Sequence, residues 1–170
     1  VWISDPWNNQ ALPYMITART EAACIAMNHK VYIIGGLVNG EWSTSIEYLD
    51  VYDIDNLDSG KYQWKYFSNY GANGFPSDLL TVNTTRNNGK RYDFITPKAI
   101  TYGTDIICIG GFGDIIQIDT IKETIHRSGT TRSSYWGFEG LKYSAIIMTF
   151  PYSYSFGGLR PDIEANLELL

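Results

Sequence analysis

The sequence predicts an all-β fold built from four-stranded antiparallel sheets. Short apolar segments rich in β-branched and aromatic residues recur along the chain, and turn-forming residues separate them. No long stretch shows the 3.6-residue apolar period of an amphipathic helix. We therefore expect strands throughout, with helices only in loops.

Each of three repeated units is predicted to begin with a β-hairpin. Three apolar segments end in a double glycine, and another short apolar segment precedes each of them. The glycine pairs are Gly35-Gly36, Gly110-Gly111 and Gly157-Gly158. Between the two apolar segments stand connections that favour tight turns in the first two units. These connections are Asn28-His29-Lys30, Gly103-Thr104-Asp105 and, in the third unit, Phe150-Pro151-Tyr152.

Two further strands complete the first two units. In the first unit they are the alternating segment 46–53 and the segment 62–67. In the second unit they are residues 115–119 and 124–126, and the third unit reaches residues 166–170 within its third strand. A complete unit is therefore expected to be a four-stranded antiparallel meander.

These residues resemble the kelch repeat, whose units are four-stranded blades of a β-propeller. Its hallmark is the double glycine that closes the second strand, followed by a Tyr and then a Trp. The first unit matches with Gly35, Gly36, Tyr52 and Trp64, and Arg19 resembles the basic residue that often enters the first strand. The second and third units keep only the double glycine. The resemblance implies a kelch-type β-propeller segment, in which the glycines allow neighbouring blades to pack closely.

The resemblance also implies that the chain is part of a larger propeller. Propellers need about four to eight blades, and 170 residues supply about three units of about 50 residues. We expect further blades of the same or another chain to complete the ring. The expected organisation is the end of a preceding blade at 1–12, a blade at 13–68, a long inter-blade loop at 69–96, a blade at 97–135 and an incomplete blade at 136–170.

Composition excludes several classes of partner and leaves the compartment open. The hydrophobic fraction of 44% is typical of a soluble folded domain, and the net charge of -5 argues against a nucleic-acid or anionic-membrane binder. No apolar run approaches the roughly 18 residues that would insert into a membrane. Cys24 and Cys108 are expected to be buried free thiols. A glycosylation acceptor at Asn83 leaves the compartment unassigned, with an intracellular one slightly favoured.

The sequence offers little to a catalytic or metal site. His29 and His126 are the only histidines, so a Ser-His-Asp relay or a His-rich metal centre has few candidates. We expect no enzyme activity and no cofactor. The alternative is a kelch-like propeller enzyme or carbohydrate-binding protein, similar to galactose oxidase or a sugar-acid isomerase, whose site lies mainly in blades outside this sequence.

The best candidates for binding lie in the loops at one end of the blades. Loops between second and third strands, and loops between blades, emerge there together; in this chain they are 37–43, 112–114, 159–164 and 69–96. The expected partner-binding residues are Arg19, Asn39, Glu41, Trp42, Phe75, Asp114 and Arg160.

Each candidate also has a structural interpretation. Trp42 could fold back onto a neighbouring blade, and salt bridges within the blade are the favoured role for Arg19 and Arg160. The loop 69–96 carries Phe75 and a basic cluster of Arg86, Lys90 and Arg91, and it could pack on a partner or cover its own propeller. We expect a non-catalytic module that binds other protein chains or serves as a scaffold.

Overall fold

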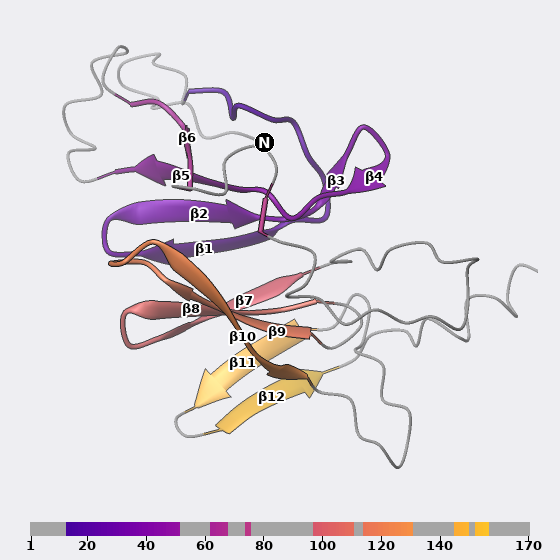
Figure 1. Ribbon diagram of the computed structural model, residues 1–170, viewed down its shortest axis with the longest axis vertical. Helices are drawn as coiled ribbons and strands as arrows, with labels where there is room; N and C mark the ends of the chain where they lie inside the picture. The colour runs from indigo at the N-terminus through magenta and orange to yellow at the C-terminus, as the bar shows by residue number, and fades with distance from the viewer. Residues whose placement is uncertain are drawn as a thin grey trace, which may run out of the picture.

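Strands make up all the regular structure that is described in the computed structural model of the chain (Figure 1). The structure describes residues 13–51, 62–67, 74–75, 97–110, 114–130, 145–149 and 152–156. These residues form two four-stranded sheets and two separate two-stranded ones, all antiparallel. The predicted all-β class is confirmed, and the described residues form no closed ring.

The first sheet has the strand order β1-β2-β5-β6. Its strands are β1 (Ala23–Met27), β2 (Lys30–Ile34), β5 (Ile46–Asp50) and β6 (Lys65–Tyr66). The predicted turn between β1 and β2 is confirmed, with Asn28 and His29 at φ angles of 50° and 59°. The four strands follow one another across the sheet in chain order, as predicted for the meander, although β6 is shorter than the predicted segment 62–67.

The second sheet repeats this arrangement with the order β10-β9-β8-β7. Its strands are β7 (Lys98–Tyr102), β8 (Asp105–Ile109), β9 (Asp114–Asp119) and β10 (Thr124–Thr130). A bulge between Arg127 and Gly129 interrupts the register of the outer strand β10. The third hairpin, β11 (Ala145–Thr149) and β12 (Tyr152–Phe156), follows below the second sheet in Figure 1.

A short hairpin that the sequence had suggested only as a loop stands between β2 and β5. It consists of β3 (Leu37–Val38) and β4 (Glu41–Trp42), and it forms a separate two-stranded sheet. Figure 1 shows this hairpin beyond the end of the first sheet, at the opposite end from the β1–β2 and β7–β8 turns. The connection between β2 and β5 therefore lies at the opposite end of the sheets from the β1–β2 and β7–β8 turns.

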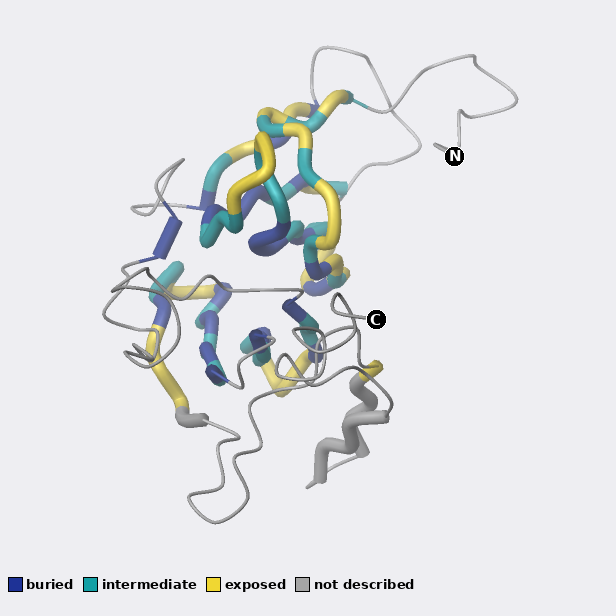
Figure 2. Tube along the Cα trace, turned by 90° about the vertical axis from the view of Figure 1, so that its right-hand side faces the viewer, coloured by how far each residue is buried: buried dark blue, intermediate teal, exposed yellow. Residues whose placement is uncertain are grey.

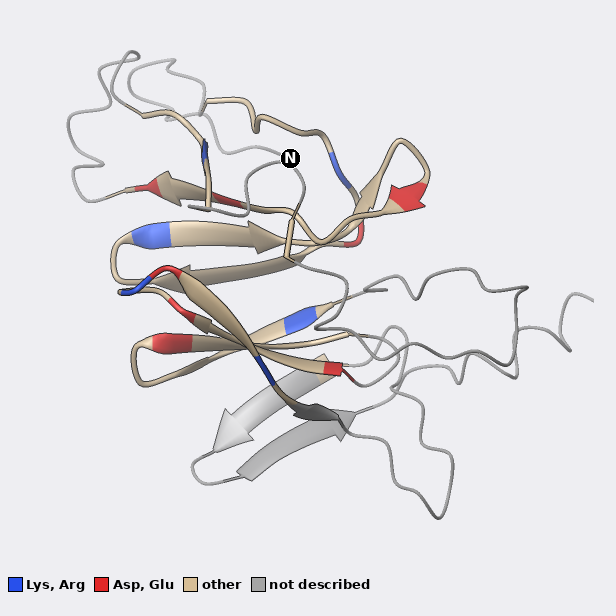
Figure 3. Ribbon diagram, in the orientation of Figure 1, with Lys and Arg blue, Asp and Glu red and all other residues tan. Residues whose placement is uncertain are grey.

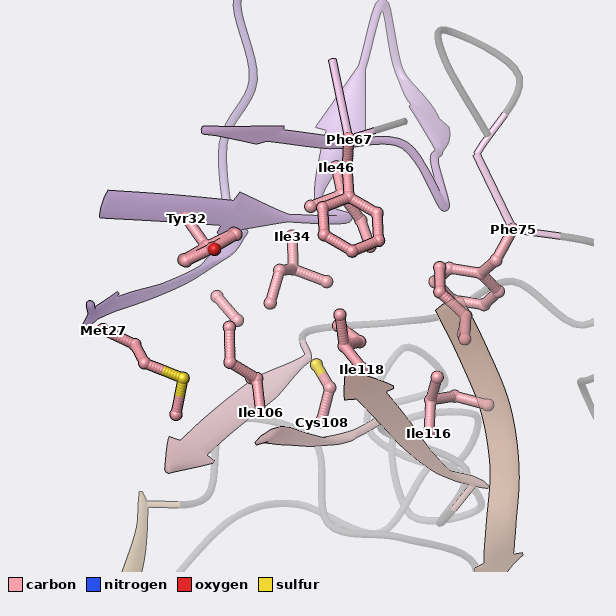
Figure 4. Close-up of a cluster of buried hydrophobic side chains, with 12 residues drawn as sticks. Met27, Tyr32, Ile34, Ile46, Phe67, Phe75, Ile106, Cys108, Ile116 and Ile118 are labelled. Atoms are coloured by element: carbon pink, nitrogen blue, oxygen red, sulfur yellow. The ribbon is translucent and has the colours of Figure 1, made fainter. Parts of the chain in front are cut away.

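The main hydrophobic core lies between the two four-stranded sheets (Figure 4). Buried positions alternate with more accessible ones along strands such as β8 and β9 (Figure 2), because successive side chains of a strand point to opposite faces. The first sheet contributes Tyr32, Ile34 and Ile46, which face Ile106, Cys108, Ile116 and Ile118 of the second. At the edge of this interface the Thr120 hydroxyl donates to the Thr104 carbonyl at 2.7 Å and accepts a hydrogen bond from Asn28 Nδ2 at 3.4 Å.

The other face of the first sheet holds a second, smaller cluster. Leu49, Tyr62 and Trp64 are buried there, with Met15 and Val31 among the partly buried residues packed against them. Trp64 fulfils its hydrogen-bonding requirement by donating from Nε1 to the Pro13 carbonyl at 2.9 Å. The segment before β1 is thereby attached to this face.

The two cysteines differ in environment. Both are free thiols, but Cys24 is exposed and Cys108 is completely buried. The prediction that Cys24 is buried was wrong, because its strand has one buried face: Ala23 and Met27 point into the core and Cys24 points away from it.

Among the described residues, no helix has the length and apolarity needed to cross a bilayer.

Candidate interaction surface

The β3–β4 hairpin has the local chemistry of a tight two-residue turn. Asn39 and Gly40 occupy its tip with φ angles of 52° and 82°, the positive values that a type I′ turn requires. Leu37 pairs with Trp42, and Val38 pairs with Glu41. Asn39, Gly40 and Glu41 are exposed, while Trp42 is half-buried. The hairpin therefore presents a polar tip followed by a large aromatic side chain.

Gly36 allows the base of the hairpin to approach the segment before β1. Its φ angle is 91°, and a Cβ atom at this position would lie 2.5 Å from the Thr20 carbonyl oxygen. Leu37 and Thr20 exchange backbone hydrogen bonds of 2.8 and 3.1 Å. The nearest neighbours of Gly36 are Thr20 and Ala22, which precede β1 of the same unit, so the close approach at this glycine lies within the unit.

Arg19 and Glu47 form a buried ion pair at the same base. Their side chains are 1% and 0% exposed. Arg19 Nη1 donates to the Gly35 carbonyl at 2.9 Å and to the Ser45 carbonyl at 3.1 Å. Glu47 also accepts hydrogen bonds from the backbone N–H groups of Ile16 and Thr17, at 2.9 and 3.1 Å. Arg19 thus has the intra-blade salt bridge that the sequence favoured, and it cannot be a surface contact for a partner.

Phe75 contacts the base of the β3–β4 hairpin at Thr44. Its N–H donates to the Thr44 carbonyl at 3.3 Å, and the Thr44 hydroxyl donates to its carbonyl at 3.2 Å. Its ring is 2% exposed and belongs to the core between the sheets. Gly74 is required beside it, since a Cβ there would lie 2.2 Å from Thr44 Oγ1. The partner-binding interpretation of Phe75 is therefore wrong: the ring packs on its own protein.

Asp114 is also placed differently from the prediction. It begins β9 and is 3% exposed, and its carboxylate lies 3.6 Å from Arg127 Nη2. Its carbonyl accepts a 2.9 Å hydrogen bond from the Gly110 N–H, which closes the connection between β8 and β9. Burial leaves this carboxylate little surface for a partner.

Several predicted residues lie outside the described part of the chain. They are Tyr52, Asn83, Arg86, Lys90, Arg91, Gly111, Gly157, Gly158 and Arg160. Of the candidates, the structure thus brings together Asn39, Glu41 and Trp42 on one hairpin.

The exposed charges on this surface are acidic. We call the hairpin and its bridged segment, residues 20–21 and 36–43, the hairpin surface. Its charged residues are Glu21 and Glu41, and both are exposed. Figure 3 draws acidic positions in red, and one of them lies on the β3–β4 hairpin. Burial lowers the pKa of Lys98, while the negative charge of Glu21 opposes this shift. The hairpin surface therefore combines an aromatic side chain with negative charge.

The described residues offer no constellation for metal chemistry. No group of three His, Cys, Asp or Glu side chains in them could hold an ion. His29 lies in the β1–β2 turn, at the opposite end from the hairpin, and His126 on β10 pairs with the Thr124 hydroxyl at 3.2 Å. The two histidines therefore lie apart, one in a turn of the first sheet and the other on a strand of the second.

Comparison with known proteins identifies the first sheet. Residues 18–68 match the family model of the Kelch motif, and this range includes β1 to β6 together with the β3–β4 hairpin. No curated protein matches the chain. The chain therefore contains a Kelch motif at residues 18–68, in agreement with the four-stranded antiparallel sheet formed there.

Proposed function

We propose that this chain is a non-catalytic protein-interaction module that binds a partner protein through the β3–β4 hairpin. The observation that carries the proposal is the contrast between the tip and the base of this hairpin. The tip residues Asn39, Gly40 and Glu41 are exposed, whereas the base residues Gly35, Gly36 and Ser45 are buried and hydrogen-bonded. A loop that is fixed before binding loses little conformational entropy when the partner arrives.

Trp42 is the proposed anchor. It is half-buried on the strand that follows the exposed tip, and Trp is among the residue types that dominate interface energies when a pocket of the partner encloses them. Its truncation to Ala is expected to weaken binding by at least about 30-fold, equivalent to about 2 kcal/mol.

The charge of the hairpin surface supports a basic partner. Glu21 and Glu41 are exposed, and the chain has a net charge of -5. Complementary charge accelerates association more than it increases affinity. We therefore propose that the partner carries Lys or Arg residues around an apolar pocket for Trp42.

The test compares three immobilised forms of the full chain, the wild type, Trp42→Ala and Tyr102→Ala, in extract from the natural source. Tyr102 is a matched control because it is an exposed aromatic on β7, beside the turn at the opposite end. Proteins retained by the wild type and Tyr102→Ala but lost by Trp42→Ala are the expected result. Circular dichroism checks that all three forms are folded.

A purified partner then allows the affinities to be measured. Glu41→Lys should slow association and reduce its salt dependence, whereas Tyr102→Ala should leave both unchanged. Equal retention of the partner by the wild type and Trp42→Ala, or loss confined to Tyr102→Ala, would contradict the proposed surface.

A further inference from the structure

We propose that Arg19 is a positioning residue that holds the β3–β4 hairpin in its binding geometry by joining the two ends of the β2–β5 connection. The importance of Arg19 for partner binding rests on the proposed function. The effect of Arg19 on the hairpin is independent of that function, because it follows from contacts within the free chain.

The Arg19 guanidinium donates hydrogen bonds to both ends of the β2–β5 connection. The connection between β2 and β5 comprises residues 35–45. Arg19 Nη1 donates to the carbonyls of Gly35 and Ser45, the first and last residues of this connection. One planar group therefore bridges both ends of the segment that carries the hairpin.

Glu47 fixes the Arg19 guanidinium in place. The carboxylate contacts Arg19 Nη2, and neither side chain has appreciable exposure. The carboxylate is held in turn by the backbone N–H groups of Ile16 and Thr17. Because a planar guanidinium donates in fixed directions, this pairing directs its remaining N–H groups toward the two carbonyls.

In the second sheet, the equivalent connection between the second and third strands is short. Only residues 110–113 separate β8 from β9. Glu47 pairs with Ile33, which lies two residues before Gly35. Ile116 pairs with Cys108, which lies two residues before Gly110. Ile116 is therefore the position in the second sheet that is equivalent to Glu47. Ile116 is completely buried among apolar side chains. The ionic pair thus accompanies the long connection, and the apolar residue accompanies the short one.

The backbone hydrogen bonds at the hairpin base provide a direct readout. Gly35 N–H donates to the Ser45 carbonyl, Leu37 N–H to Thr20 and Ser43 N–H to Gly36. Two backbone amides outside the hairpin base serve as controls. They are the Gly110 N–H, which donates to the Asp114 carbonyl, and the Val51 N–H, which donates to the His29 carbonyl. Hydrogen exchange at these five amides can be followed by NMR in the full chain without any partner.

Two variants separate hairpin positioning from charge neutralisation. Arg19→Lys keeps a cation beside Glu47 but lacks the planar fork, so exchange at Gly35, Leu37 and Ser43 should accelerate by roughly tenfold, which is about 1.4 kcal/mol. Arg19→Met combined with Glu47→Ile removes both charges and imitates the second sheet at Ile116. It should stay folded, with the same acceleration at the hairpin base and unchanged exchange at Gly110.

The outcomes decide between positioning and simple charge pairing. Wild-type exchange at the hairpin base in both variants would overturn the inference, and so would equal acceleration at all five amides. Either result leaves the binding test with Trp42→Ala unaffected. Once a partner is known, Arg19→Lys should also weaken its binding, whereas Tyr102→Ala should not.

Discussion

The two four-stranded sheets have the same strand order, but different types of side chain pack on their equivalent faces. In the second sheet, Ile116 and Ile118 lie in an apolar core against the first sheet. In the first sheet, the equivalent face carries Glu47 and Leu49, and the segment that covers it includes Arg19. The same strand arrangement thus has an apolar centre where another sheet covers it, and an ionic centre where the segment that contains Arg19 covers it.

The largest expected effect follows from replacing the Arg19–Glu47 ion pair of the first sheet with apolar side chains. Glu47→Ile leaves the Arg19 guanidinium buried without its carboxylate, so the free energy of unfolding should fall by about 3–5 kcal/mol. Adding Arg19→Met should make the double variant more stable than the sum of the two single effects by about 2 kcal/mol. Urea denaturation measures all four forms, and strictly additive effects would show that the pair is not coupled.

The next effect concerns the glycines on the long connection. Gly36→Ala should destabilise the protein by about 3 kcal/mol, because the methyl group would meet the Thr20 carbonyl in a backbone conformation unfavourable for Ala. Gly40 has a similar positive φ but no atom within 4 Å of a Cβ, so Gly40→Ala should cost only about 1 kcal/mol. Thermal unfolding of the two variants compares them, and equal losses would refute the role of close approach.

A smaller, pH-dependent effect distinguishes Tyr32 from its equivalent in the second sheet, Ile107. Burial, assisted by the charges of Tyr48, Glu123 and Asp50, raises the pKa of Tyr32 from 10 to about 12 despite the opposing effect of a hydrogen bond with Thr120. Between these two pH values the unfolded chain releases a proton that the folded chain retains, so stability should be intact below pH 10 and decline up to about pH 12.

The matching variant is Tyr32→Phe. It should cost about 1 kcal/mol at neutral pH through the lost hydrogen bond, and stability should decline less steeply above pH 10. Some slope should persist, because burial also raises the pKa of Tyr48. Denaturation curves recorded from pH 8 to about 12 test this; identical slopes in the wild type and the variant would exclude Tyr32 as the titrating group.

The smallest effect is expected for the ion pair of the second sheet. Arg127 is 38% exposed and lies 3.6 Å from Asp114, so solvent screens the interaction. Arg127→Met should lower the free energy of unfolding by no more than about 1 kcal/mol, and most of this loss should vanish in about 1 M salt. A loss as large as that of Glu47→Ile would contradict the contrast between the two pairs.

The sequence by itself determined the local features of this protein. Turn residues such as Asn28-His29 and Gly103-Thr104 predicted both hairpins, because positive φ angles and tight turns depend on the residues that adopt them. The alternation in the segment 46–53 and the glycine pairs predicted the meanders. Asn39, Glu41 and Trp42 were placed on one connection for the same reason, since they are neighbours in the chain.

Only the tertiary structure decided which distant residues meet. Arg19 pairs with Glu47, and Phe75 pairs with Thr44, across separations of 28 and 31 residues. Nothing local in the sequence distinguishes an arginine that binds a partner from one that bridges two carbonyls. Likewise, the burial of Cys108 and the exposure of Cys24 depend on which face of each strand another sheet covers. Dihedral preferences act between neighbouring residues, whereas burial and ion pairing are set by the packing of segments that the chain brings together only when it folds.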